Sequence, residues 1–361
     1  MTLKTPFYES HIAAKGKMVP FAGYMLPVQY QAGVIAEHMT VRQKVGIFDV
    51  SHMAEITLCG KDAMANVQML VTNECGNMVD GQVKYSPMCN DEGTTVDDLL
   101  VYKVDNEHIL LVVNAANHEK DVEWIKGHLF GDVVFEDISD NVAQLAIQGP
   151  KTLDVMHKIC NEAELPTKYY TFVPRIQIAG KTCLVSRTGY TGEYGFEIYC
   201  ANEDATAIWD AIMENGQDVG LLPCGLGCRD TLRFEAGMPL YGHEMDDTIT
   251  PVEAGLGFAV KMTKENFIGK KALEEKGAPT RKLCTLKVTG KGIAREHQDV
   301  YVGDQKVGQT CSGTHCPFLG GAFATAILDL PYNEVGTKVE VDVRGRRVEA
   351  EVVATPIYKR A

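Results

Sequence analysis

Hydrophobic and polar residues follow two different periods in the first third of the chain, and the two periods predict strands that alternate with helices. Residues 53–58 alternate between apolar and polar positions, which predicts a strand. Residues 61–71 place apolar side chains at helical spacing. Residues 33–46 are also predicted to be helical, with cationic residues in the last turn and Gly46 as the C-cap.

The next stretch predicts a β-hairpin followed by a third strand and a helix. Residues 83–89 and 94–102 have strand character, and the polar sequence of residues 90–93 predicts the turn between them. A third strand is expected at residues 108–113. Asn117 is the expected N-cap of a helix over residues 118–129. This segment therefore predicts a mixed α+β unit.

The remaining pattern predicts more of the same mixture and then a change of architecture. We expect strands at residues 142–147 and 176–185, helices at 152–160 and 204–214, and a helix that begins near residue 224. From residue 281 onward, short strands separated by glycine turns predict a small barrel or sandwich. The predicted domains are residues 1–276, with two intertwined α+β subdomains, and residues 281–361.

Residues 188–197 form the densest cluster of candidate chemistry, because three glycines, two tyrosines and two glutamates lie within ten positions. Strand-like residues flank the segment, so its glycines are expected where the backbone turns tightly or approaches another group. Tyr190 and Glu197 are then able to face one pocket. A tyrosine face stacks on a flat heterocycle and a carboxylate accepts two parallel N–H bonds, as a reduced pterin requires. An exposed glycine-rich hairpin is the alternative.

Two further candidates lie outside this segment. Asp97 and Asp98 are adjacent in a predicted strand, so alternation sends them to opposite faces and one of them points inward. An inward aspartate is able to steer a proton, whereas an exposed edge pair has no such role. Arg229 lies near a predicted helix start, where it is able to bind a carboxylate or a phosphate. The alternative is a surface helix with an intrahelical ion pair, because Arg229–Arg233 and Asp230–Arg233 are at helical neighbour spacing.

Composition narrows the classes of function. The chain has 361 residues, 45% hydrophobic and 23% charged, and a net charge of −13, which is typical of a multidomain globular protein and argues against nucleic-acid binding. Residues 281–361 are mildly basic, with twelve Lys and Arg against nine Asp and Glu.

No apolar run approaches membrane-spanning length, so we expect no membrane segment. The eleven scattered cysteines and the unremarkable start predict reduced thiols and a cytoplasmic protein. No metal site is predicted.

Several motifs together resemble one family. They are Phe48–Met53 (FDVSHM), Val96–Tyr102 (VDDLLVY), Val112–Ala115 (VVNA), Thr188–Glu197 (TGYTGEYGFE), Gly225–Ala236 (GLGCRDTLRFEA) and Leu240–Asp246 (LYGHEMD). In this order they resemble the T-protein of the glycine cleavage system, a folate-dependent aminomethyltransferase. The resemblance runs over essentially the whole chain and is therefore more specific than any single motif.

This resemblance implies a cloverleaf of α+β folate-binding domains with a small C-terminal β-barrel. It implies transfer of an aminomethyl group from the lipoyl arm of the H-protein to the cosubstrate tetrahydrofolate, with release of ammonia. Asp98 matches the family's essential aspartate, which makes it the expected inward acid. Glu197 matches the pterin-binding carboxylate. The other folate contacts that the resemblance implies are Met53, Tyr85, Tyr102, Val112, Asn114, Tyr170, Tyr190 and Arg229.

Two relatives with the same fold are rival interpretations. Folate-dependent demethylases take a one-carbon group from a small methylated donor and share the Glu197 and Tyr190 pocket, but they need no lipoyl partner. A non-catalytic folate-binding relative linked to iron–sulfur cluster maintenance carries a cysteine immediately before a Tyr-x-Gly-Gln-Glu segment. Here Leu240 precedes Tyr241, which argues against that relative.

Overall fold

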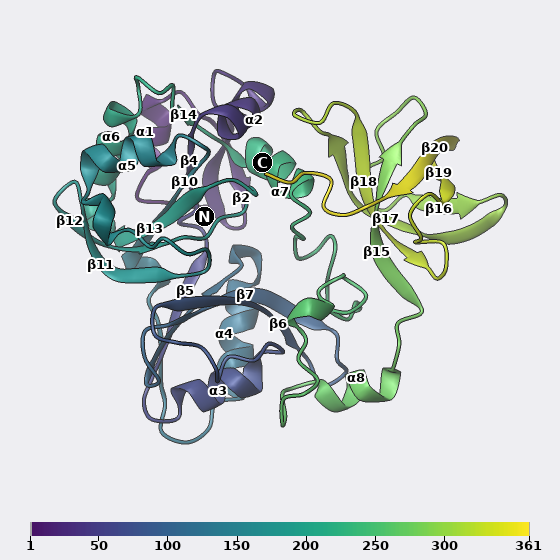
Figure 1. Ribbon diagram of the computed structural model, residues 1–361, viewed down its shortest axis with the longest axis horizontal. Coiled ribbons are helices and arrows are strands. Elements are labelled where there is room, and N and C mark those ends of the chain that lie inside the picture. Colours follow the sequence, from purple (N-terminus) through teal and green to yellow (C-terminus); the bar gives the residue numbers. More distant parts are fainter. Residues whose placement is uncertain (1, 361) are drawn as a thin grey trace. The chain divides into compact units, whose positions relative to one another are not determined.

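The computed structural model (Figure 1) describes residues 2–360, and the chain divides into two compact units. The first unit comprises the chain up to residue 67, residues 75–85 and residues 99–232. The second comprises residues 68–74, residues 86–98 and the chain from residue 233 onward. The chain thus passes between the units several times. The predicted domain boundary between residues 276 and 281 is a different division, and it stays a prediction.

A six-stranded sheet forms the centre of the first unit. Its strand order is β11(Phe172–Ile178)-β12(Lys181–Ser186)-β13(Gly195–Ala201)-β10(Val142–Gln148)-β4(Gly46–Asp49)-β14(Leu222–Pro223). Helices α5 (Thr152–Ile159) and α6 (Ala205–Asn215) pack their apolar faces on this sheet, where Met156 and Trp209 join the buried core. The expected single strand over 176–185 is wrong, because Ala179 and Gly180 both adopt positive φ and turn the chain between β11 and β12.

Helix α2 (Val34–Gln43) is shorter than predicted, and Gly46 does not cap it. Gly46 instead begins β4, where an added Cβ would lie 2.5 Å from Cγ2 of Val41 and 2.7 Å from Sγ of Cys224. The glycine is therefore needed for close packing between helix and strand. A three-stranded sheet of β1 (Leu3–Lys4), β3 (Tyr24–Gln29) and β2 (Lys17–Phe21) lies near the N-terminus, together with α1 (Tyr8–Ala13).

The predicted hairpin and third strand are confirmed within a five-stranded sheet. Its strand order is β6(Gln82–Cys89)-β7(Thr95–Lys103)-β8(His108–Val113)-β5(Ala54–Cys59)-β9(Val134–Asp137). Helices α3 (Ala63–Leu70) and α4 (His118–Gly127) also match the predicted periods. Asn117 is the N-cap residue of α4 as expected, but its side chain makes no capping hydrogen bond, and it closes a short 3₁₀ turn that leads into α4.

Residues after 281 close into a barrel, which confirms the predicted change of architecture (Figure 1). The strand order is β15(Arg281–Val288)-β18(Ala322–Asp329)-β17(Gln305–His315)-β16(Asp299–Val302)-β19(Lys338–Val343)-β20(Arg346–Val353). Alternate residues of each strand, among them Leu286, Ala326 and Val341, fill a continuous buried core. The same unit contains α8 (Lys270–Lys276) and the C-terminal end of α7 (Leu226–Glu235).

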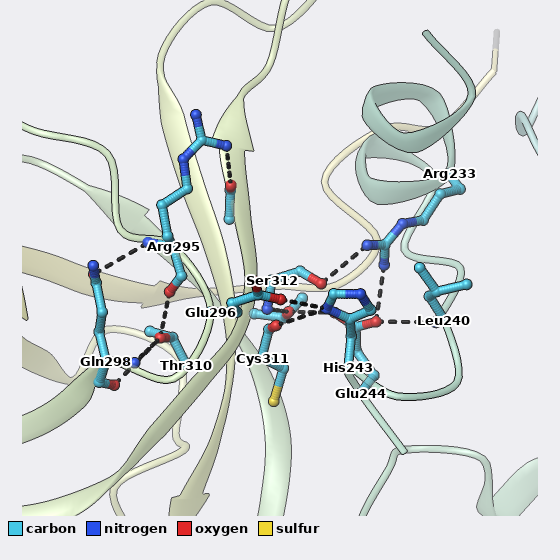
Figure 2. A network of polar contacts seen from close by, with 12 residues as sticks. Arg233, Leu240, His243, Glu244, Arg295, Glu296, Gln298, Thr310, Cys311 and Ser312 are labelled. Carbon is cyan, nitrogen blue, oxygen red and sulfur yellow. Dashed lines mark hydrogen bonds and ion pairs between the residues drawn. The ribbon is translucent and has the colours of Figure 1, made fainter. Parts of the chain in front are cut away.

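A buried ion pair attaches the segment after α7 to the barrel (Figure 2). Arg233 donates to Glu244 at 2.8 Å and to Ser312 on β17 at 3.0 Å. Glu244 also accepts from the backbone N–H of Leu240 at 2.9 Å and from Thr325 on β18 at 2.6 Å. Burial raises the pKa of the Glu244 carboxyl, but the Arg233 charge and these hydrogen bonds outweigh burial and lower it overall.

Replacing Glu244 with Gln is expected to lower the free energy of unfolding by about 3–5 kcal/mol at pH 7.5, because the Arg233 charge is left buried and unpaired. The lowered pKa of Glu244 contributes stability above its unfolded pKa, and this stability is lost as pH falls through the folded pKa. The mutant deficit should therefore shrink toward pH 3. Denaturant unfolding at several pH values measures it. Glu275→Gln, in an exposed pair with Lys271, is the control and should cost less than about 0.5 kcal/mol.

Three findings concern the cysteines, membrane-spanning helices and metal sites. All eleven cysteines are free thiols. Within residues 2–360, no helix is both long and apolar enough to cross a membrane. In the same part of the chain, no group of three or more His, Cys, Asp or Glu side chains is arranged to hold a metal ion.

Candidate functional site

Glu197 lies on β13 in the interior of the first unit, with only 7% of its surface exposed. The loop that precedes this strand turns at Gly192, where φ is +79°, and runs so close to Gln148 that a Cβ on Gly189 would lie 2.2 Å from its Oε1. The expectation that these glycines permit turning and close approach is confirmed. Thr188, at the start of the same loop, donates a hydrogen bond to Oε2 of Glu197.

Arg229 interacts with both Tyr190 and Glu197, the two residues that the sequence predicts to face one pocket. Its guanidinium lies over the ring of Tyr190, 4.7 Å from the ring centroid. Burial has the largest effect and raises the pKa of Glu197 overall, although the hydrogen bond from Thr188 and the positive charge of Arg229 act in the opposite direction. An aromatic face, a guanidinium and a carboxylate are thus associated through α7 and the loop between β12 and β13. This combination suits a flat ligand that donates paired N–H groups.

Four predicted contact residues meet in one hydrophobic cluster. Tyr102 and Val112 belong to its buried part, and Met53 and Tyr170 pack against it half-buried. Tyr102 has no exposed surface, and its hydroxyl forms hydrogen bonds to other side chains, so this residue presents no surface that a ligand is able to touch. The other two predicted contacts are half-buried: Tyr85 lies on β6 and Asn114 directly follows β8.

All nine predicted folate contacts belong to the first unit, whereas the predicted catalytic aspartate belongs to the second. Of the two adjacent acids on β7, Asp97 is completely buried and Asp98 is half-buried. Strand alternation separates them as expected. The expectation that Asp98 is the inward acid is wrong, because Asp97 is the fully buried one of the pair. Asp98 keeps the exposed surface that contact with a substrate requires.

Two buried polar residues near Arg229 and Glu197 are not among the site residues that the sequence predicts. Glu55 on β5 lies directly opposite Val112 on β8, so both side chains lie on one face of the sheet. Neither carboxyl oxygen of Glu55 has a hydrogen-bond partner within residues 2–360. Nδ1 of His52 has none in that range either, and burial and the nearby Arg229 charge lower the His52 pKa to about 4. A single acid in a hydrophobic strand is the only sequence signal for Glu55.

Glu55→Gln is expected to stabilise the protein increasingly as pH rises. Burial and the negative charges of Asp137 and Glu197 raise the pKa of Glu55 well above its usual value. With a raised folded pKa, stability is fully present below the unfolded pKa of about 4.3 and is lost as pH rises toward the folded pKa. The gain from Gln should grow by about 1.4 kcal/mol per pH unit in that window. Denaturant unfolding between pH 5 and 8 measures this gain, and a constant difference would contradict it.

Two protein-family models match this chain. The GCVT N-terminal domain model matches residues 7–264, and the glycine cleavage T-protein C-terminal barrel domain model matches residues 281–359. The chain belongs to the glycine cleavage T-protein family. The sequence prediction of an aminomethyltransferase of the glycine cleavage system is thereby confirmed, as is the mixed α/β fold with a C-terminal barrel.

Individual members of this family match the chain over nearly its full length. An aminomethyltransferase of Geobacillus sp. (strain WCH70) is 48% identical over 364 residues and is covered completely, as is this chain. One of Bacillus cereus (strain AH187) is 48% identical over 99% of this chain and 98% of its own length. The crystal structure of glycine cleavage system aminomethyltransferase T from Bartonella henselae matches with a TM-score of 0.91 at 28% identity, covering 99% of both chains.

Proposed function

We propose that this protein transfers the aminomethyl carbon carried on the lipoyl arm of the H-protein to tetrahydrofolate. The products are 5,10-methylenetetrahydrofolate, ammonia and the dihydrolipoyl H-protein. The carbon–sulfur bond to the lipoyl arm and the carbon–nitrogen bond to the departing amine break, and two bonds from the carbon to folate nitrogens form. Of the two protons that leave the folate, one ends on the lipoyl sulfur and the other on the departing amine.

The observation that supports this proposal best is the buried Glu197 beside Arg229 and Tyr190. A pterin presents an amino group and a ring N–H side by side, and one ionised carboxylate accepts both in parallel. Tyr190, held under the Arg229 guanidinium, offers an aromatic edge and face to the ring system. The hydrophobic cluster around Met53 and Val112 excludes water, which otherwise hydrolyses a released one-carbon unit.

Asp98 is proposed to manage the protons of the transfer. The attacking folate amine must be neutral, and the departing amine must gain a proton to leave as ammonia, so a carboxylate that reaches both amines serves the two steps. Half-burial of Asp98 on a rigid strand is consistent with such access. The role itself comes from the family resemblance of residues 96–102.

The test is ammonia release from H-protein loaded with the aminomethyl group, measured with and without tetrahydrofolate. We expect strong stimulation by tetrahydrofolate and formation of 5,10-methylenetetrahydrofolate in equal amount. Free aminomethyl donors without the H-protein should react far more slowly. Tetrahydrofolate binding without stimulated release would reject the proposal in favour of a small methylated donor.

A further inference from the structure

Four buried hydroxyl groups form an unbroken line from the interior of the first unit to Glu197. Tyr199 and Tyr102 have hydroxyl oxygens 2.8 Å apart, Tyr102 lies 3.1 Å from Oγ of Ser186, and Ser186 lies 2.6 Å from Oγ1 of Thr188. Thr188 then donates to Glu197. We call Tyr199, Tyr102, Ser186 and Thr188 the hydroxyl chain. Each of the four residues is at most 4% exposed.

Strand register brings the hydroxyl chain together. Ser186 on β12 pairs with Glu197 on β13, and Leu184 pairs with Tyr199, so the β12 and β13 members extend along one face of two neighbouring strands. Tyr102 reaches them from β7, and its ring packs edge-on against Tyr199 with centroids 5.8 Å apart. Three separate strands and the loop after β12, which contains Thr188, therefore supply one continuous hydrogen-bonded line.

The direction of every hydrogen bond in the hydroxyl chain follows from its two ends. At one end, an ionised Glu197 only accepts, so Thr188 spends its single proton there and must accept from Ser186. By the same count Ser186 accepts from Tyr102, and Tyr102 accepts from Tyr199. At the other end, Nε2 of Gln144 donates to the Tyr199 hydroxyl at 3.0 Å, and an amide N–H is able only to donate.

The orientation has an electrostatic consequence for Glu197. Burial raises the pKa of Tyr102 and of Tyr199, so both keep their protons and remain donors. Four O–H dipoles then point toward one carboxylate, and aligned hydrogen bonds polarise one another in a low-dielectric interior. The charged and titratable groups that interact electrostatically with Glu197 include Glu55, Tyr102, Tyr170, Tyr199 and Arg229.

We propose that the hydroxyl chain, oriented by Gln144, favours the ionised form of Glu197 against the effect of burial and so prepares this carboxylate to bind the N–H groups of the pterin. This inference rests on the proposed function. The members of the chain are positioning residues, because they act on the ligand through Glu197. Neither tyrosine of the chain needs to touch the ligand, which explains why Tyr102 is completely buried although it lies among the predicted folate contacts.

The test is the pH dependence of tetrahydrofolate binding to the full chain. Glu197→Gln is the reference variant, because it removes this carboxyl and leaves only the titration of the ligand to affect binding. Thr188→Val should move the midpoint attributed to Glu197 upward by about one pH unit, because it deletes the terminal donor to a charged group. Affinity near the original midpoint should then fall several-fold, with less than about a twofold change at pH 8. Tyr199→Phe should shift the midpoint in the same direction by less, since Tyr102 still donates.

Matched variants separate this role from a merely structural one. Thr188→Ser keeps the donor and should restore the wild-type midpoint. Tyr30→Phe removes another buried hydroxyl, bonded to His11 at 2.9 Å, and should leave the midpoint in place. An equal loss of affinity at every pH in Thr188→Val, or an unmoved midpoint, would overturn the inference.

A second readout keeps this inference separate from the proposed function. Carboxyl ¹³C NMR of labelled glutamates, with the Glu197 signal identified by its absence in Glu197→Gln, follows the Glu197 titration without any ligand. An upward shift of the Glu197 titration midpoint in Thr188→Val and Tyr199→Phe supports the proposed role of the hydroxyl chain. Normal tetrahydrofolate binding by Glu197→Gln would reject only the assignment of Glu197 to the pterin. Unshifted titrations would reject the chain even if the pterin assignment holds.

Discussion

Asp98→Asn is expected to reduce tetrahydrofolate-dependent ammonia release by about 10²–10⁴-fold while the affinity for tetrahydrofolate changes little. The amide preserves the shape and half-buried position of the side chain but neither takes up nor delivers a proton at neutral pH. The loss should therefore appear in kcat. Single-turnover release from aminomethyl-loaded H-protein measures it directly.

Asp97 provides a control on the same strand. Asp97→Asn alters a completely buried carboxylate and should lower the free energy of unfolding rather than the rate of transfer by folded protein. If Asp97→Asn abolishes transfer in protein that remains folded, and Asp98→Asn does not, the two acids exchange roles and the assignment of Asp98 is wrong.

Glu197→Gln is expected to weaken tetrahydrofolate binding by about 100-fold or more at pH 7.5. An ionised carboxylate accepts two N–H bonds from the pterin, and each hydrogen bond to a charged group contributes about 1.5–3 kcal/mol. The amide presents one donor in place of one acceptor, so one pterin N–H then faces another N–H. Equilibrium titration of ligand binding measures the loss.

Glu193 lies four residues away and is equally buried, but it has a different partner. It pairs with Arg42 at 2.8 Å, and Arg42 also donates to the backbone of Thr191 at 2.7 Å. Glu193→Gln should therefore destabilise the fold without changing the pH dependence of ligand binding. An equal loss of affinity in both variants would show that Glu197 acts through folding of the loop rather than as a ligand group.

Local patterns were sufficient for most elements of the fold. The turn at residues 90–93, the apolar spacing of α3 and the glycine-separated strands after residue 281 each involve neighbours in sequence, so propensity and period determine them. The errors lie where tertiary contacts decide. The local pattern predicts Gly46 as a helix cap, but its lack of a side chain serves packing against Cys224, which lies 178 positions away in the sequence.

The sequence alone determined the chemistry available to this protein: the family motifs, the adjacent acids and the glycine-rich segment around Tyr190 and Glu197. Tertiary structure decided how these groups are used. Only strand register shows that Ser186 lies opposite Glu197 and that Glu55 lies opposite Val112, because a shift of one residue would turn each side chain to the other face. Only burial distinguishes Asp97 from Asp98. Hydroxyl groups from β7, β12, β13 and the loop after β12 form a directed chain because packing excludes water from them, and no local pattern of residues predicts that exclusion.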